Sequence, residues 1–145
     1  VLPAPTRPEG MPIGTSVPPF ALEDLDGNAV TPAMVFGNMQ VLVNWSPTCG
    51  YCVRIAPDLA RLTGALRRSD IELVLVTSGS VAENRRVLDD TGLDCTVWRG
   101  DSFDLFDGLG TPTAYLVDEQ GAIASELQLG ANELPAFLEQ LVAGG

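Results

Sequence analysis

Residues 41–52 read Val-Leu-Val-Asn-Trp-Ser-Pro-Thr-Cys-Gly-Tyr-Cys, and they join a candidate strand to a candidate helix. The first five residues are mostly apolar, which is typical of a central strand buried on both faces. Cys49 and Cys52 follow, with two residues between them. Apolar side chains then recur at helical spacing, at Val53, Ala56, Leu59, Leu62 and Leu66. A C-x-x-C pair between a buried strand and an amphipathic helix predicts a redox-active dithiol.

The chemistry of such a pair follows from its place in the fold. The first cysteine lies at the helix N-terminus, where unpaired N–H groups and the positive end of the helix dipole favour the thiolate. We therefore predict Cys49 as the nucleophile, with a pKa below the ~8.5 of a free thiol. Cys52, one turn further in, is predicted to be the more buried sulfur. It would resolve the mixed disulfide that Cys49 forms with a substrate.

Other interpretations of the cysteines fit less well. A structural zinc site needs four ligands, and the sequence has no His and only one further cysteine, Cys95. An inert disulfide suits a buried position better than a loop after a strand. Cys95 is interpreted as a small core residue on an apolar strand, with a resolving or regulatory thiol as the alternative. We predict neither a metal nor a cofactor.

Composition narrows the function further. The 145 residues carry 8 basic and 19 acidic side chains, a formal net charge of −11. Such a surface repels phosphate backbones and argues against a nucleic-acid partner. The absence of His removes Ser–His and Cys–His catalysis. No stretch reaches the ~20 apolar residues that cross a bilayer.

The chain is expected to form one α/β domain over residues 13–143, preceded by a proline-rich linker or tail over residues 1–12. A hairpin is predicted around the Asp-Gly-Asn of residues 26–28. Further strands are predicted over residues 71–77, 95–98, 113–117 and 123–129. Helices are predicted over residues 81–91, with Ser80 and Glu83 as a capping box, and from an Asn132 cap to about residue 142.

These motifs resemble the thioredoxin superfamily. Residues 44–52, with Pro57 five residues later, are similar to its active site, and the Gly-Thr-Pro-Thr of residues 110–113 is similar to its cis-proline loop. Residues 20–27 and the helix near 81–91 resemble the TlpA/ResA-like branch, which also contains relatives of the AhpC/TSA proteins. The resemblance implies a thioredoxin-like fold, with a central mixed sheet flanked by helices and an N-terminal β-hairpin extension.

The resemblance also implies a substrate site. Pro112 would follow a cis bond and lie beside the disulfide, and Thr111 would offer backbone hydrogen bonds to a substrate peptide. The other substrate-binding residues implied are Trp45, Thr48, Gly50 and Tyr51. The partners implied are disulfide- or dithiol-containing proteins, and a membrane thiol carrier. The proline-rich start and the missing initiator Met add to an expected place outside the bacterial cytoplasm, on a tether removed with an N-terminal segment.

The sequence departs from the family where a carboxylate proton acceptor is known. Those two positions hold Val43 and Ile55, so deprotonation of Cys52 must use water or a carboxylate from elsewhere, or be slower. The Trp usually found before the first cysteine is Thr48, and the usual Pro within the motif is Tyr51. A redox potential cannot be read from either of these two changes.

Three alternatives stand beside the expected protein-disulfide reductase. An oxidase of exported proteins would use the same dithiol in the opposite direction. A peroxiredoxin-like peroxidase would show P-x-x-x-[ST]-x-x-C, and Ser46 fits this pattern, but Leu42 stands where it requires Pro. A thioredoxin-like binding module without turnover would have no need of an intact C-x-x-C.

Overall fold

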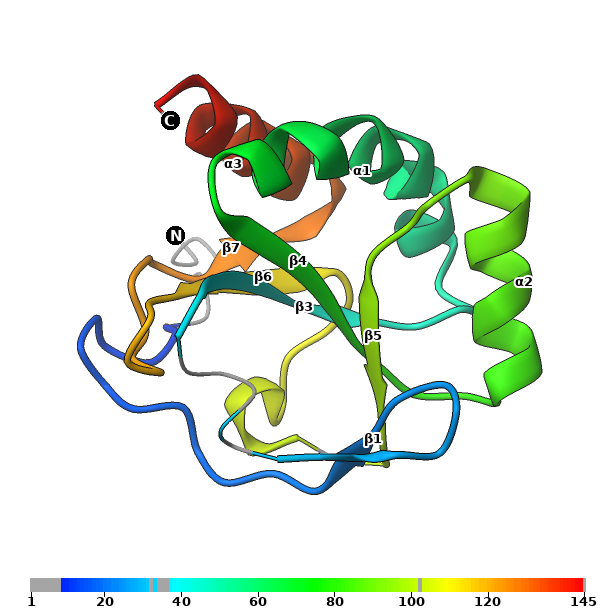
Figure 1. The fold of residues 1–145 in the computed structure, drawn as a ribbon, viewed down its shortest axis with the longest axis horizontal. Coiled ribbons are helices and arrows are strands. Elements are labelled where there is room, and N and C mark those ends of the chain that lie inside the picture. The colour runs from blue at the N-terminus through cyan, green and yellow to red at the C-terminus, as the bar shows by residue number, and fades with distance from the viewer. Residues whose placement is uncertain (1–8, 32, 34–36, 102, 145) are drawn as a thin grey trace, which may run out of the picture.

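A mixed sheet of seven strands organises the described part of the chain, residues 9–31, 33, 37–101 and 103–144 of the computed structural model (Figure 1). The strand order is β2-β1-β5-β4-β3-β6-β7. The strands are β1 (Leu22–Glu23), β2 (Ala29–Val30), β3 (Met39–Trp45), β4 (Ile71–Thr77), β5 (Thr96–Arg99), β6 (Thr113–Val117) and β7 (Gln128–Leu129). β3, β4 and β5 run parallel, whereas β6 is antiparallel to β3. The predicted tail lies mostly outside the described residues.

Side chains that alternate along the central strands build an apolar layer on each face of the sheet. Val41, Val43 and Trp45 pack toward helices α1 (Gly50–Arg68) and α3 (Gly130–Ala143). These two helices lie together over one face of the sheet (Figure 1). Leu42 belongs to the opposite layer, which includes Trp98 and the aromatic residues around the 3₁₀ turn Asp104–Phe106. The expected α/β fold with a buried central strand is confirmed.

The helix α2 (Val81–Thr91) has the predicted bounds because its local signals are complete. Ser80 accepts a hydrogen bond from the Glu83 N–H, and the Glu83 carboxylate accepts one from the Ser80 N–H. Gly92 ends the helix with φ 73°, a left-handed conformation that glycine adopts readily. None of the helices in the described residues is both long and apolar enough to cross a membrane.

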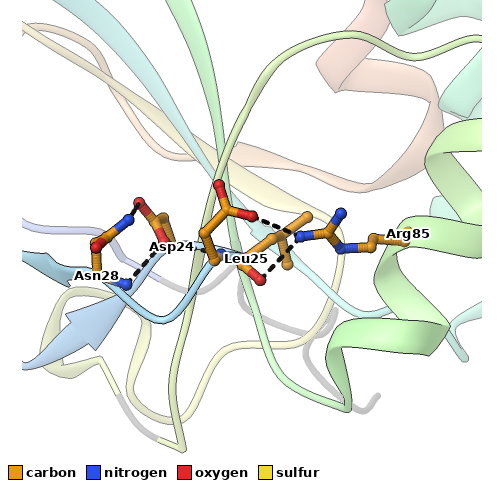
Figure 2. A network of polar contacts seen from close by, with 5 residues as sticks. Asp24, Leu25, Asn28 and Arg85 are labelled. Atoms are coloured by element: carbon orange, nitrogen blue, oxygen red, sulfur yellow. Dashed lines mark hydrogen bonds and ion pairs between the residues drawn. The ribbon is translucent and has the colours of Figure 1, made fainter.

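The predicted N-terminal hairpin is formed by β1 and β2, and it joins the sheet where Glu23 pairs with Arg99. The Asp24 carboxylate accepts hydrogen bonds from the N–H groups of Asp26 and Asn28, both at 2.9 Å, which closes the turn. Arg85 of α2 donates to the Leu25 carbonyl at 3.1 Å and to the Asp26 carboxylate at 2.8 Å (Figure 2). The hairpin is therefore tied both to the sheet and to α2.

Two predicted boundaries were wrong. The last helix begins at Gly130 rather than after an Asn132 cap, because the Glu133 carboxylate accepts from the Leu129 N–H at 3.0 Å and Leu129 becomes the capping residue. The strand predicted over residues 123–129 is reduced to β7 and a single bridge between Val117 and Ile123. Here the Ser125 hydroxyl accepts the Leu116 N–H at 2.9 Å, so a side chain replaces a backbone partner in the ladder.

Candidate active site

The two cysteines lie where the central strand β3 gives way to α1. Cys49 is the N-cap residue of α1, with extended backbone angles, and Cys52 lies in the first helical turn. Cys49 is half-buried and Cys52 is fully buried, and both are free thiols. The order of burial predicted for the two sulfurs is therefore the one observed.

Opposing effects act on the pKa of the Cys49 thiol. Partial burial raises this pKa, but hydrogen bonds from the Thr111 side chain and from the backbone of Cys52 and Tyr51 stabilise the thiolate and outweigh it. The net result is a pKa below that of an ordinary thiol. In its thiol form, Cys49 Sγ donates to the Thr111 carbonyl oxygen at 3.6 Å.

The pKa of the Cys52 thiol is shifted in the opposite direction. Burial raises the pKa of Cys52 to about 12, and the neighbouring Cys49 adds to this increase. A backbone contact with Ser46 opposes it without cancelling it. Of these two adjacent thiols, Cys49 is the one that ionises at the lower pH.

A second loop lies against Cys49 and carries Thr111 and Pro112. The peptide bond between these residues is cis. Pro112 is buried, Thr111 is half-buried, and the chain then enters β6 at Thr113. The Pro112 carbonyl accepts the Gly130 N–H at 2.9 Å, which fixes this loop to the start of α3.

The remaining predicted substrate-binding residues lie in two different environments. Thr48 and Gly50 are exposed on either side of Cys49, and 61% of Tyr51 is exposed. The Arg54 guanidinium lies 5.5 Å from the centre of the Tyr51 ring, a cation–π contact. Trp45 is only 2% exposed and packs in the core, so it does not form an open surface beside the cysteines.

A cavity of about 280 Å³ lies next to Thr111. Its lining combines mostly buried apolar side chains with exposed acidic ones. The apolar members are Leu22, Trp45, Val76, Phe103, Phe106 and Leu109, and the acidic members are Asp101 and Asp107. The cavity and Cys49 thus share Thr111 as a neighbour.

One functional-site residue escaped the sequence analysis. Asn44, on β3, donates from Nδ2 to the Gly110 carbonyl at 2.9 Å and to the Leu109 carbonyl at 3.4 Å. The Thr113 hydroxyl also donates to the Gly110 carbonyl, at 3.0 Å. A polar side chain directly after the apolar run of residues 41–43 in the central strand was the signal that could have drawn attention to Asn44.

Cys95 lies away from the other two cysteines. It precedes β5, whereas Cys49 follows β3, and these strands belong to one parallel set, so the two thiols are at opposite ends of the sheet. Cys95 packs against the core layer beneath α1. Burial raises the pKa of Cys95 to about 12, and the carboxylates of Glu72 and Asp94 raise it as well. This position favours the core interpretation over that of a resolving thiol.

The fold and the cysteine site together define a thioredoxin-like domain with a dithiol at a helix N-terminus. Residues 13–137 match the model of the AhpC/TSA family, and the chain belongs to that family. The resemblance stated from the sequence is thereby confirmed.

Individual relatives agree with this assignment. The chain is 27% identical over 108 residues to a protein named thiol-disulfide oxidoreductase ResA, from Halalkalibacterium halodurans. The match covers 72% of this chain and 61% of the relative, so the chain spans less than two thirds of that protein.

Solved structures show the same fold at low identity. The thioredoxin domain of a thiol-disulfide oxidoreductase from Bacteroides vulgatus superposes with a TM-score of 0.75 and 19% identity, over 92% of this chain and 99% of that one. A secreted Mycobacterium tuberculosis disulfide oxidoreductase homologous to E. coli DsbE superposes with a TM-score of 0.70 and 20% identity, over 87% and 96% of the two chains. Both comparisons establish a thioredoxin-like fold.

Proposed function

We propose that this chain catalyses thiol–disulfide exchange through Cys49 and Cys52. The observation that carries the proposal is the contrast between the two thiols. Cys49 is accessible and has a lowered pKa, while Cys52 is buried beside it with a pKa raised to about 12. A nucleophile needs the first environment, and a resolving thiol protected from side reactions suits the second.

The reaction is balanced in two steps. The Cys49 thiolate attacks one sulfur of a substrate disulfide, which forms a mixed disulfide and releases the other substrate sulfur as a thiolate. Cys52 then loses its proton and attacks Cys49 Sγ, which releases the second substrate sulfur. The substrate gains two electrons and two protons, and the enzyme is left with a Cys49–Cys52 disulfide.

Removal of the proton from Cys52 is the difficult step of this reaction. The family positions for a carboxylate acceptor hold Val43 and Ile55, and both side chains are buried. We therefore infer that the proton leaves to water or to the departing substrate thiolate. Resolution of the mixed disulfide should then be slow relative to its formation.

The substrates we propose are disulfide-containing proteins. The exposed Thr48, Gly50 and Tyr51 surround Cys49, and 38% of Val53 is also exposed on the first turns of α1. The backbone of Thr111 lies beside Cys49 and could pair with an extended substrate segment, with Pro112 behind it. The 280 Å³ cavity beside Thr111 could then receive a neighbouring substrate side chain.

The direct test is reduction of the disulfides of insulin by the reduced protein. Cys49→Ala should abolish this activity, because Cys52 is buried with a pKa raised to about 12 and Cys95 lies at the opposite end of the sheet. Cys52→Ala should instead accumulate mixed disulfides with substrate, which non-reducing electrophoresis would resolve. Full activity of Cys49→Ala would remove the proposal.

We further propose that the protein works as a reductant outside the cytoplasm, with a membrane thiol carrier as its electron donor. The fold shared with a secreted oxidoreductase supports this place. The resemblance of the sequence to the TlpA/ResA-like branch supports this direction. Equilibration with glutathione should give a potential nearer the about −270 mV of thioredoxin than the about −120 mV of a strong oxidant. A potential near the latter value would favour the oxidase alternative, and rapid consumption of peroxide by the reduced protein would favour a peroxidase.

A further inference from the structure

Asn44 connects the two halves of the site. It belongs to β3, whose chain continues through Trp45 and Pro47 to Cys49. It pairs across the sheet with Thr113, which is the first residue of β6 and directly follows Pro112. Its side chain bonds the carbonyl groups of Leu109 and Gly110, which immediately precede Thr111. One side chain on the cysteine strand therefore holds the loop that faces the cysteine.

The loop depends on these hydrogen bonds because little else fixes its middle. At one flank, the Leu109 N–H donates to the Phe106 carbonyl at 3.0 Å, and at the other, Pro112 is bonded to Gly130. Between these points, a Cβ atom added to Gly110 would find no atom within 4 Å, so packing does not hold that residue in place. The Gly110 carbonyl is held instead by Asn44 and by Thr113.

The placement of Thr111 matters for two separate reasons. Its carbonyl lies 3.6 Å from Cys49 Sγ, and its side chain stabilises the Cys49 thiolate. Its backbone is also the segment along which a substrate would align. A shift of this loop would therefore affect both the ionisation of the nucleophile and the alignment of a protein substrate.

We propose that Asn44 is a positioning residue for thiol–disulfide exchange, which sets Thr111 against Cys49 by holding the Leu109 and Gly110 carbonyl groups. This inference rests on the proposed function of Cys49 as the nucleophile. It assigns to Asn44 no contact with the reacting sulfur atoms. Asn44 acts through Thr111, and its removal should change the site only while Thr111 is present.

The test is a double-variant cycle on the reduced protein. Asn44→Leu keeps the size of the side chain and removes its donors, and Thr111→Val removes the hydroxyl that stabilises the thiolate. The pKa of Cys49 is read from the pH dependence of its alkylation by iodoacetamide. The values of kcat/KM are read with insulin and with hydroxyethyl disulfide. Ser125→Ala is the control, because it removes a buried hydrogen bond near the far end of β6.

In the wild-type background, Asn44→Leu should raise the pKa of Cys49. It should also lower kcat/KM for insulin by about fivefold to tenfold, the effect of one lost hydrogen bond. The rate with hydroxyethyl disulfide should fall only as far as the thiolate fraction does. In the Thr111→Val background, Asn44→Leu should leave the pKa of Cys49 unchanged. Ser125→Ala should lower the free energy of unfolding without changing the pKa or either rate.

Three results would overturn the inference: an unchanged Cys49 pKa and insulin rate in Asn44→Leu, full additivity with Thr111→Val, or the same changes in Ser125→Ala. If Asn44→Leu does not fold by circular dichroism, Asn44→Ala replaces it in the same cycle. Failure of the proposed function would look different, because wild-type Cys49 would then not react with hydroxyethyl disulfide at all.

Discussion

Cys49 and Cys52 lie in different environments although they are only three positions apart in the chain. Cys49 caps α1 and meets hydrogen-bond donors from Thr111 and from the helix backbone, whereas Cys52 enters the core beneath the first turn. The spacing of the motif was enough to predict which sulfur is buried. It was not enough to predict how Thr111 contributes, because that contact joins positions 62 residues apart.

Cys95 should be dispensable for exchange. It lies at the opposite end of the sheet from Cys49 and packs against the core, so Cys95→Val is close to a volume-conserving change. We expect unchanged rates of insulin reduction and a loss of less than about 1.5 kcal/mol in the free energy of unfolding. Urea titration and the insulin assay measure the two quantities. A large loss of turnover at unchanged stability would instead make Cys95 a functional thiol.

The site residues that could be predicted are those marked by a local sequence motif, and the roles that could not are those that depend on distant contacts. Cys49, Cys52 and the Thr111–Pro112 loop could be found because each carries a short local motif. The polar side chain of Asn44 could be noticed in the strand, but its role could not be predicted, because that role depends on the carbonyl groups of a loop more than sixty residues away. For Trp45 the resemblance implied a substrate-binding role, and the structure places its side chain in the core and in the lining of the cavity beside Thr111.

At the scale of elements, α2 is attached to the sheet through a buried amide. Asn84 is 3% exposed, and its Nδ2 donates to the carbonyl groups of Ser78 and Ser80 at 2.9 and 2.8 Å. The Thr77 hydroxyl donates to Asn84 Oδ1 at 2.9 Å. These bonds shape the loop between β4 and α2, which passes close to the active-site segment at Pro47.

Substitution of Asn84 should therefore cost far more stability than substitution of its neighbour Arg85. Asn84→Leu leaves buried polar groups without partners, and we expect a loss of about 2 kcal/mol or more in the free energy of unfolding. Arg85→Gln breaks an ion pair whose two side chains are 51% and 75% exposed, and should cost at most about 1 kcal/mol. Urea unfolding of both variants tests this order. Equal losses would mean that the buried amide stabilises the protein no more than the hairpin link shown in Figure 2.

Gly79 offers a sharper test of how this loop supports the site. Its φ is 82°, and a Cβ atom there would lie 2.9 Å from Pro47 Cγ, two residues before Cys49. Gly92 has φ 73°, and a Cβ atom added to Gly92 would have no atom within 4 Å. Both Ala substitutions should lose stability through backbone strain, by roughly 1 kcal/mol. Gly79→Ala should lose more and should also slow insulin reduction, whereas Gly92→Ala should keep its rate. Equal rates in the two variants would show that the Pro47 contact does not affect Cys49.

Element boundaries were predictable where the capping signal is local and failed where it is not. The helix α2 has its capping box and its terminal glycine in sequence, and its predicted bounds match the structure. The start of α3 was wrong because the Glu133 carboxylate, rather than Asn132, completes the cap. The strand predicted after residue 122 was wrong because the Ser125 hydroxyl replaces a backbone partner in the ladder. The alternation of apolar residues along the chain does not reveal this replacement.

On the scale of the whole molecule, the buried thiols make stability depend on pH. In the reduced protein, Cys52 and Cys95 keep their protons until about pH 12, the pKa to which burial raises both. In the unfolded chain the same thiols ionise near pH 8.5. Between these values the folded state binds more protons than the unfolded state. Linkage then requires the free energy of unfolding to fall as the pH rises.

The sign for Cys49 is the opposite. Its folded pKa is lowered, so its stabilising contribution is fully present above the pKa of the unfolded thiol and is lost as the pH falls through the folded value. Cys49 therefore adds a constant to the stability at alkaline pH and leaves the slope unchanged. The alkaline slope reports Cys52 and Cys95 alone among the cysteines.

Oxidation separates the contribution of Cys52 to this slope from that of Cys95. Each of these two thiols should contribute a slope that approaches roughly −1.4 kcal/mol per pH unit above the pKa of the unfolded thiol, because the folded-state pKa of both is about 12. A Cys49–Cys52 disulfide removes the proton of Cys52, so the oxidised protein should lose stability less steeply than the reduced protein. Cys95→Ala should make both slopes shallower by the same amount. Urea unfolding of the reduced and oxidised forms from about pH 9.5 to pH 11, above the pKa of the unfolded thiol, measures the slopes. Identical slopes in the two forms would contradict a buried, protonated Cys52 in the reduced enzyme.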